Sequence, residues 1–149
     1  MRQDSLATSY MNAVDTNILI YAHDPRDPLK HQTAEHLVRS LPDTVLLWQV
    51  ACEFISASRK LTSFGFNRQK AWQELRKLQR AWALKLPSLA VLNSAERLLD
   101  DYSLSFWDAM IIAASLEGGV TCLYSEDFDA YGSIEGLKLV NPFRAAQPS

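Results

Sequence analysis

The chain has 149 residues, of which 48% are hydrophobic and 21% are charged, as in ordinary globular proteins. This length predicts one domain with a single core. The formal net charge of -2 excludes a polycation, so any contact with nucleic acid must come from a local basic patch or a bound cation.

The two ends of the chain lack the patterns of the rest. Residues 1–11 have no apolar stretch of the kind a secretory signal needs, and no apolar run reaches the length of a membrane span. We therefore expect a cytoplasmic protein with a flexible extension over 1–11, a single domain over 12–144 and a short tail over 145–149.

The first half of the chain alternates short apolar strands with helices. Pro25 and Pro28 break regular structure over 24–28, and Gly65 interrupts the chain again. The predicted elements are a strand over 13–16 that continues into a turn or short helix, a helix over 29–41, a strand over 44–48 and a helix over 49–64.

The second half repeats this alternation. A helix over 67–83 has Asn67 as its expected N-cap, and its apolar face carries Trp72, Leu75, Leu78 and Trp82. The other predicted elements are a short strand over 84–87, helices over 88–103 and 106–119, a strand over 120–125, a loop over 126–136 and a strand over 137–140.

Short apolar strands that alternate with helices indicate an α/β fold. Right-handed βαβ units would place the strands in a parallel sheet covered by helices on both faces. In such sheets the functional site lies at the carboxyl ends of the strands.

Four acidic residues fall at predicted strand ends or helix starts: Asp15, Glu53, Asp108 and Asp127. Each has a plain structural explanation. Asp15 fits an Asx-turn or helix cap, Glu53 a solvated helix residue, Asp108 a partner of the helix dipole and Asp127 a turn residue. Together, however, four acids at one sheet edge would repel one another strongly unless a cation lay between them.

Mg²⁺ or Mn²⁺ prefers oxygen ligands of this kind. A divalent ion held by carboxylates lowers the pKa of a bound water and neutralises charge on a phosphoryl group. The four acids therefore favour hydrolysis of a phosphate ester.

The ordered segments VDTNILIYA, QVACEF, SFWDAMIIAAS, LYSEDF and GLKLVNPF resemble a PIN domain of the bacterial VapC type, from about Asn12 to Phe143. The resemblance implies a three-layer α/β/α sandwich with a short parallel sheet. It also implies a Mg²⁺- or Mn²⁺-dependent endoribonuclease that cuts single-stranded or looped RNA, as the toxin of a toxin–antitoxin pair. A small antitoxin and a homodimer are the expected partners.

The resemblance also assigns roles within the site. Asp15 and Asp108 would bind the metal directly, while Glu53 and Asp127 would complete the site directly or through water. Asn17 and Ser125 match the polar positions beside the acids and would orient ligands or water.

The segment from Arg59 to Lys85 is basic, with eight Lys and Arg residues against the single acid Glu74. Arg76, Lys77 and Arg80 are its candidate contacts to an RNA backbone. The alternative is a solvated helix face. Helical spacing favours a core or dimer-interface position for Trp72 and Trp82 over base stacking.

The remaining candidate ligands are Cys52 and Cys122, in apolar surroundings, and three histidines. We interpret the cysteines as buried reduced thiols. The histidines, His23, His31 and His36, lack zinc spacing and are expected at the surface or as loop caps, although His23 could approach the site.

Three other functions compete with the ribonuclease. An aspartyl-phosphate phosphatase wants a second acid two residues after the first, where this chain has Asn17. A receiver-like scaffold needs a phosphorylatable Asp ending a middle strand and a Lys ending a late strand, and neither is convincing here. A PIN domain could also act as an RNA-processing or binding module without a toxin role.

Overall fold

The computed structural model describes residues 10–144. The predicted C-terminal tail and the first nine residues of the predicted N-terminal extension lie outside the described residues. Met11, the last residue of the predicted extension, instead pairs with Thr121: its backbone N–H donates to Thr121 Oγ1 at 3.0 Å, and its carbonyl accepts from the Thr121 N–H at 2.8 Å.

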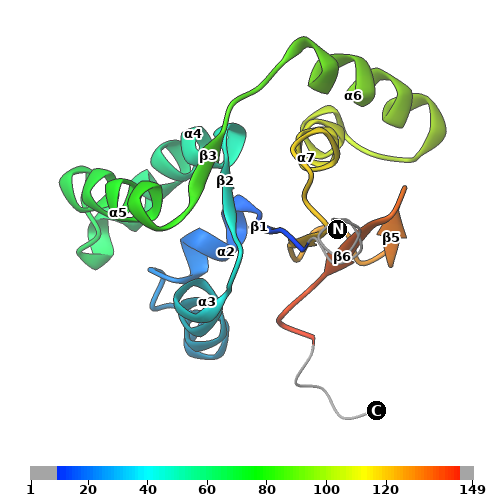
Figure 1. Cartoon of the computed structure of the whole chain (residues 1–149). Coiled ribbons are helices and arrows are strands. Elements are labelled where there is room, and N and C mark those ends of the chain that lie inside the picture. Colours follow the sequence, from blue (N-terminus) through cyan, green and yellow to red (C-terminus); the bar gives the residue numbers. More distant parts are fainter. Residues whose placement is uncertain (1–9, 145–149) are drawn as a thin grey trace, which may run out of the picture.

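The central sheet is short and mostly parallel (Figure 1). Its strands follow the order β1 (Asn12–Val14), β4 (Cys122–Tyr124), β6 (Leu137–Val140) and β5 (Ser133–Ile134). Only β5 runs antiparallel to its neighbour. A second parallel pair, β2 (Val45–Leu47) and β3 (Ala83–Lys85), connects to β1 through the bridge between Asn12 and Thr44.

The helices lie on both sides of these strands (Figure 1). They are α2 (Thr16–Tyr21), α3 (Pro28–Ser40), α4 (Trp48–Ala57), the 3-10 helix η1 (Ser58–Phe64), α5 (Arg68–Ala81), α6 (Leu89–Asp101) and α7 (Phe106–Glu117). α7 packs against β2, β6 and α6, whereas α2 packs with α3 and α4. The predicted three-layer α/β/α fold is therefore confirmed.

The core explains why the strands read as continuous apolar runs. Ala13, Val14 and Leu123 are at most 2% exposed, because helices cover both faces of the sheet. α7 is apolar on most of its surface for the same reason: it lies between the strands and α6.

Three sequence predictions differ from the structure. The helix expected over 49–64 divides into α4 and η1, which ends at Gly65 with a left-handed φ of 91°. The loop expected over 126–136 contains β5. Trp72, expected on the apolar face of its helix, is 44% exposed because its neighbour Ala71 takes the core position.

The predicted pair of buried thiols is also wrong. Cys122, the first residue of β4, is half-buried. Cys52 is exposed because the face of α4 that enters the core carries Ala51 and Phe54 instead. His36 is exposed as expected, whereas His23 stacks on Phe66 with ring centroids 4.2 Å apart. Burial lowers the pKa of His23. Among residues 10–144, no helix is long and apolar enough to cross a membrane.

Two leucines of α6 test this description of the core. Leu98 is fully buried, whereas Leu92 on the same helix is 50% exposed. Leu98→Ala is expected to lower the free energy of unfolding by about 2–5 kcal/mol, through lost burial and the cavity it leaves. Leu92→Ala should lower it by less than about 1 kcal/mol. Urea unfolding of both variants measures the difference, and equal losses would contradict the packing of α6 on α7.

Candidate active site

Asp15 lies where β1 ends and α2 begins. Its backbone N–H donates to the carbonyl of Tyr124 at 2.8 Å, which extends the parallel pairing of β1 and β4 by one step. Its carboxylate caps α2 by accepting the Thr16 N–H at 2.7 Å, and accepts the Ser125 hydroxyl at 2.7 Å. The side chain is buried, with 7% of the residue exposed. Asp15 is therefore the N-cap of α2, as expected, whatever further role it has in the site.

Ser125 connects Asp15 to the next acid. Its hydroxyl oxygen accepts a hydrogen bond from the backbone N–H of Asp127 at 3.0 Å, while its O–H donates to the carboxylate of Asp15. The Asn17 amide donates to the Asp127 carboxylate at 3.0 Å and also lies 3.4 Å from Ser125 Oγ. The amide oxygen of Asn17 is buried and has no hydrogen-bond partner among the described residues. This oxygen is therefore free to accept a bond from a ligand.

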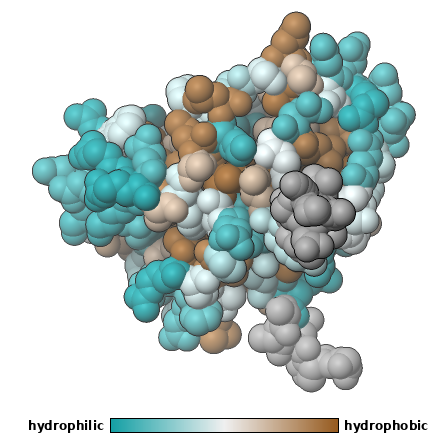
Figure 2. Space-filling model, viewed as in Figure 1, coloured by the Kyte–Doolittle hydropathy of each residue, from teal (hydrophilic) through white to brown (hydrophobic). Residues whose placement is uncertain are grey.

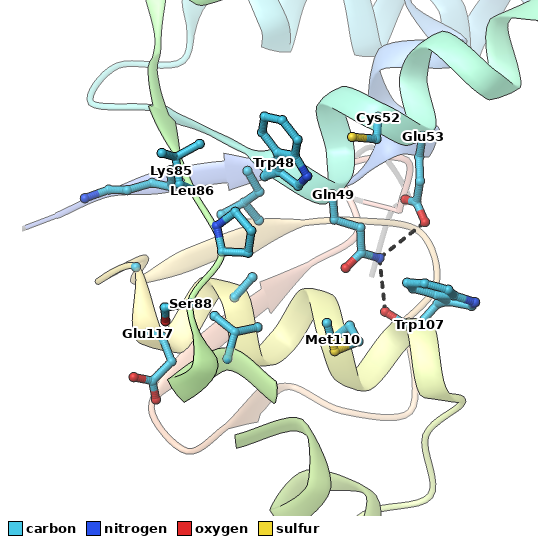
Figure 3. A pocket seen from close by; sticks show the side chains of 15 residues that line it. Trp48, Gln49, Cys52, Glu53, Lys85, Leu86, Ser88, Trp107, Met110 and Glu117 are labelled. Atoms are coloured by element: carbon cyan, nitrogen blue, oxygen red, sulfur yellow. Dashed lines mark hydrogen bonds between the residues drawn. The ribbon is translucent and has the colours of Figure 1, made fainter. Parts of the chain in front are cut away.

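Glu53 reaches the same place from α4. One carboxylate oxygen accepts the Thr16 hydroxyl at 2.8 Å, and the other accepts the Gln49 amide at 3.2 Å. The same Gln49 amide donates to the carbonyl of Trp107 at 3.3 Å, which ties α4 to the start of α7 (Figure 3). Sequence reasoning missed Thr16 and Gln49. The signals available were the position of Thr16 next to Asp15 and the one-turn spacing of Gln49 and Glu53.

Asp108 lies in the first turn of α7, whose N-cap is Ser105. Its side chain is half-buried, and its charge acts on Asp127. Burial is the largest cause of the raised pKa of Asp127, and repulsion from Asp108 is the next. The charge of Asp108 thus reaches Asp127, and the charges of Asp127 and Glu53 reach Asp15, so the four acids belong to one region at the carboxyl edge of the sheet.

Burial raises the pKa of Asp15 from 3.8 to about 6. The hydrogen bonds from Ser125 and Thr16 oppose this rise, whereas the negative charges of Asp127 and Glu53 add to it. None of the four acids forms an ion pair with a Lys, Arg or His between residues 10 and 144. The site therefore holds negative charge that no cationic side chain in the described structure balances.

The carboxylates could hold a hydrated cation. Within the described range, no three His, Cys, Asp or Glu side chains lie close enough to ligate one ion together. Mg²⁺ commonly keeps several waters and takes only one or two carboxylates directly, so an all-oxygen set of this kind fits it. The buried, unpartnered oxygen of Asn17 is one further acceptor for such waters.

An apolar groove of about 580 Å³ adjoins Glu53 (Figure 3). Trp48, Leu86 and Trp107 line it and are 45%, 68% and 61% exposed. Figure 2 shows apolar surface in the upper middle of the molecule, between the more polar surfaces of α5 and α6. A cluster of exposed apolar side chains such as this one is typical of a binding site for another molecule.

The predicted RNA contacts Arg76, Lys77 and Arg80 are exposed on α5, at the left edge of Figure 1. Lys77 Nζ lies 3.9 Å from Glu74 Oε1. These three residues are not part of the acid cluster or of the groove beside it.

The family model described as "PIN domain" matches residues 13–132. Solved structures share the fold. A toxin–antitoxin complex from Klebsiella pneumoniae is 19% identical with a TM-score of 0.67, covering 88% of this chain and 97% of that chain. VapC20 from Mycobacterium tuberculosis, a toxin that cleaves the sarcin–ricin loop, is 20% identical with a TM-score of 0.60, covering 83% and 97%. No curated protein matches the sequence.

The raised pKa of Asp15 predicts a pH-dependent cost to stability in the metal-free protein. The folded pKa lies above the unfolded value, so the favourable contribution is fully present below about pH 4 and is lost as the pH rises through about 6. The difference between the ordinary pKa of 3.8 and a folded pKa of about 6 corresponds to on the order of 3 kcal/mol. Asp15→Asn stays neutral and still offers an oxygen to the Thr16 N–H, so it should be more stable than the wild type at about pH 7.5.

This gain should shrink as the pH falls to about 5, where wild-type Asp15 is itself mostly protonated. Urea unfolding in EDTA at both pH values measures the difference between the two proteins. Glu96→Gln, which removes a carboxylate from the exposed face of α6, is the control and should change stability little at either pH. A difference between wild type and Asp15→Asn that does not vary with pH would contradict the burial of a charged Asp15.

Proposed function

Because the chain belongs to the PIN domain family, we propose that it is a Mg²⁺- or Mn²⁺-dependent endoribonuclease that hydrolyses RNA phosphodiester bonds, as the toxin of a type II toxin–antitoxin system acting in the cytoplasm. One observation carries the proposal. Four electrostatically coupled carboxylates lie in one region at the carboxyl edge of the sheet, and no cationic side chain of residues 10–144 pairs with them.

We assign the metal to Asp15 and Asp108, with Glu53 and Asp127 completing the site through water. A bound divalent ion would supply an activated water and would neutralise charge on the phosphoryl oxygens. The protein's own part is to fix the acids in place. Ser125 holds the Asp15 carboxylate, and Asn17 holds that of Asp127.

Glu53 has its own supports, since Thr16 and Gln49 each donate to one of its oxygens. Each of these two donors also lies close to another acid. Thr16 follows Asp15 in the chain, and the Gln49 amide donates to the carbonyl of Trp107, the residue before Asp108. The carboxylates of Asp15, Glu53 and Asp127 are therefore held before a ligand arrives, which reduces the reorganisation that binding requires.

The apolar groove beside Glu53 supports a protein partner. Structures that share the fold include toxin–antitoxin complexes, among them VapBC-1 from nontypeable Haemophilus influenzae, at 16% identity and a TM-score of 0.62. We propose that a small antitoxin inserts an apolar segment into the groove lined by Trp48, Leu86 and Trp107, next to the acids. The homodimer stays a prediction, which the mass of the purified chain in solution would test.

The metal assignment predicts that Asp15→Asn and Asp108→Asn each abolish cleavage while the fold is kept. Each change removes a negative charge from the proposed metal site with little change in side-chain volume. The measurement is Mg²⁺-dependent cleavage of a mixed RNA pool, with circular dichroism as the check on folding. Lys138→Gln, at the opposite end of the sheet, should cleave as the wild type does. Wild-type activity in either acid variant would overturn the assignment.

Charge reversal at Arg76, Lys77 and Arg80 together is expected to weaken RNA binding and to flatten its dependence on salt. Each lost phosphate contact on a single strand lowers the slope of log K against log salt by about 0.7. Fluorescence anisotropy of a labelled RNA over a range of KCl concentrations measures this slope. An unchanged slope would assign the exposed face of α5 to solvent alone.

A further inference from the structure

A second pocket opens beside Thr16 and Asn17 and shares no lining residue with the apolar groove. It encloses about 320 Å³ between α2, the turn that follows α2, and the junction of α4 with η1. Thr16 and Asn17 line it, and the same two side chains hydrogen-bond Glu53 and Asp127. The pocket is therefore one hydrogen bond away from two of the four acids.

Lys60 also lines this pocket, on the same helical segment as Ala57. Glu53, Ala57 and Lys60 are spaced four and three residues apart along α4 and η1, so they share one face of the continuous helical segment. The seven residue steps from Glu53 to Lys60, part α-helix and part 3-10 helix, rise roughly 12 Å. Lys60 is thus near enough to the acids for one nucleic-acid strand to reach both.

Arg26 lines the same pocket and is held in a fixed orientation. Its Nε and Nη2 donate to the two carboxylate oxygens of Asp24 at 2.9 and 2.8 Å, and its guanidinium lies 5.0 Å from the centre of the Phe64 ring. The Arg26 side chain is nevertheless 51% exposed. An arginine oriented in this way loses little conformational entropy when it binds an anion.

The acidic residues that line the pocket pair with cations other than Lys60. Asp24 is paired with Arg26, and Glu126 is paired with Lys30 at 2.9 Å and accepts the Tyr21 hydroxyl. Lys60 forms no ion pair with any residue from 10 to 144. The acids that line the pocket are thus already balanced, and the lysine adds positive charge beside a strongly acidic site.

We propose that Lys60 and Arg26 bind a backbone phosphate of the RNA strand next to the bond that is cut. This inference rests on the proposed ribonuclease function. The acids repel the substrate's phosphates, so a cationic contact one or two nucleotides away offsets that repulsion and fixes the strand across the acid cluster. The contact reads no sequence, because a phosphate is common to every nucleotide.

Lys60→Gln tests the proposal, with Lys138→Gln as the matched control. Both lysines are exposed and both changes remove one positive charge, but Lys138 lies on β6 at the amino ends of the strands, opposite the acids. Binding of a short fluorescein-labelled single-stranded RNA is measured by anisotropy in the Asp108→Asn background, so that the RNA is not cut. Cleavage is measured separately with Asp108 intact.

Lys60→Gln should weaken RNA binding by about three- to tenfold and lower the salt slope by about 0.7. In the cleavage assay it should raise KM and leave kcat within about twofold, since a contact made equally in the ground and transition states affects binding alone. Lys60→Glu should weaken binding further, whereas Lys138→Gln should match the wild type. Unfolding midpoints should be unchanged for all three, because both side chains are exposed.

The outcomes separate this inference from the function on which it rests. If the wild type cleaves RNA and Lys60→Gln behaves as Lys138→Gln does, the phosphate contact is wrong and the ribonuclease stands. If the wild type neither binds nor cleaves RNA with Mg²⁺ or Mn²⁺, both are overturned. A loss of kcat without a change in KM would also contradict a binding contact.

Discussion

The hydrogen bond from Ser125 to the buried carboxylate of Asp15 is the contact on which the rest of the site depends. It forms because β1 and β4 pair in parallel, with Val14 opposite Tyr124, so the residues that follow the two strands lie side by side. A carboxylate that is 7% exposed is costly to bury, and donors from Ser125 and Thr16 offset part of that cost. Asn17 and Asp127 then gather around Ser125.

Three chemically different surfaces meet at this point. The acids occupy the carboxyl edge of the sheet, the apolar groove adjoins Glu53, and a separate pocket lined by Lys60 and Arg26 begins at Thr16 and Asn17. Glu53 is central to this arrangement, since it lines the groove and accepts from Thr16, which lines the pocket. A partner in the groove and a strand in the pocket would therefore both act close to the same carboxylate. This proximity gives a physical route by which a bound protein could block a nuclease.

Much of the fold was accessible from the sequence. Apolar runs such as VLL and LKLV predicted strands close to their observed bounds, and Asn67 and Gly65 mark element ends as expected. The predictions that were wrong concern features that depend on tertiary contacts rather than on the local sequence pattern. The short strand β5 forms only because Ser133 and Ile134 lie against β6, and Trp72 is exposed because Ala71 packs inward instead. Cys52 is exposed by the orientation of α4, which its neighbours' hydrophobicity does not specify.

The sequence by itself determined the α/β alternation, the family resemblance and the four acids that deserve testing, because strand period, helix stops and charged residues within apolar segments are local signals. Only the tertiary structure decided what surrounds those acids. Thr16 holds Glu53 from 37 residues away, and Lys60 shares one pocket with Asn17 and Arg26, which are distant from it along the chain. Such contacts depend on strand register and helix packing, which bring together side chains whose sequence separation carries no signal.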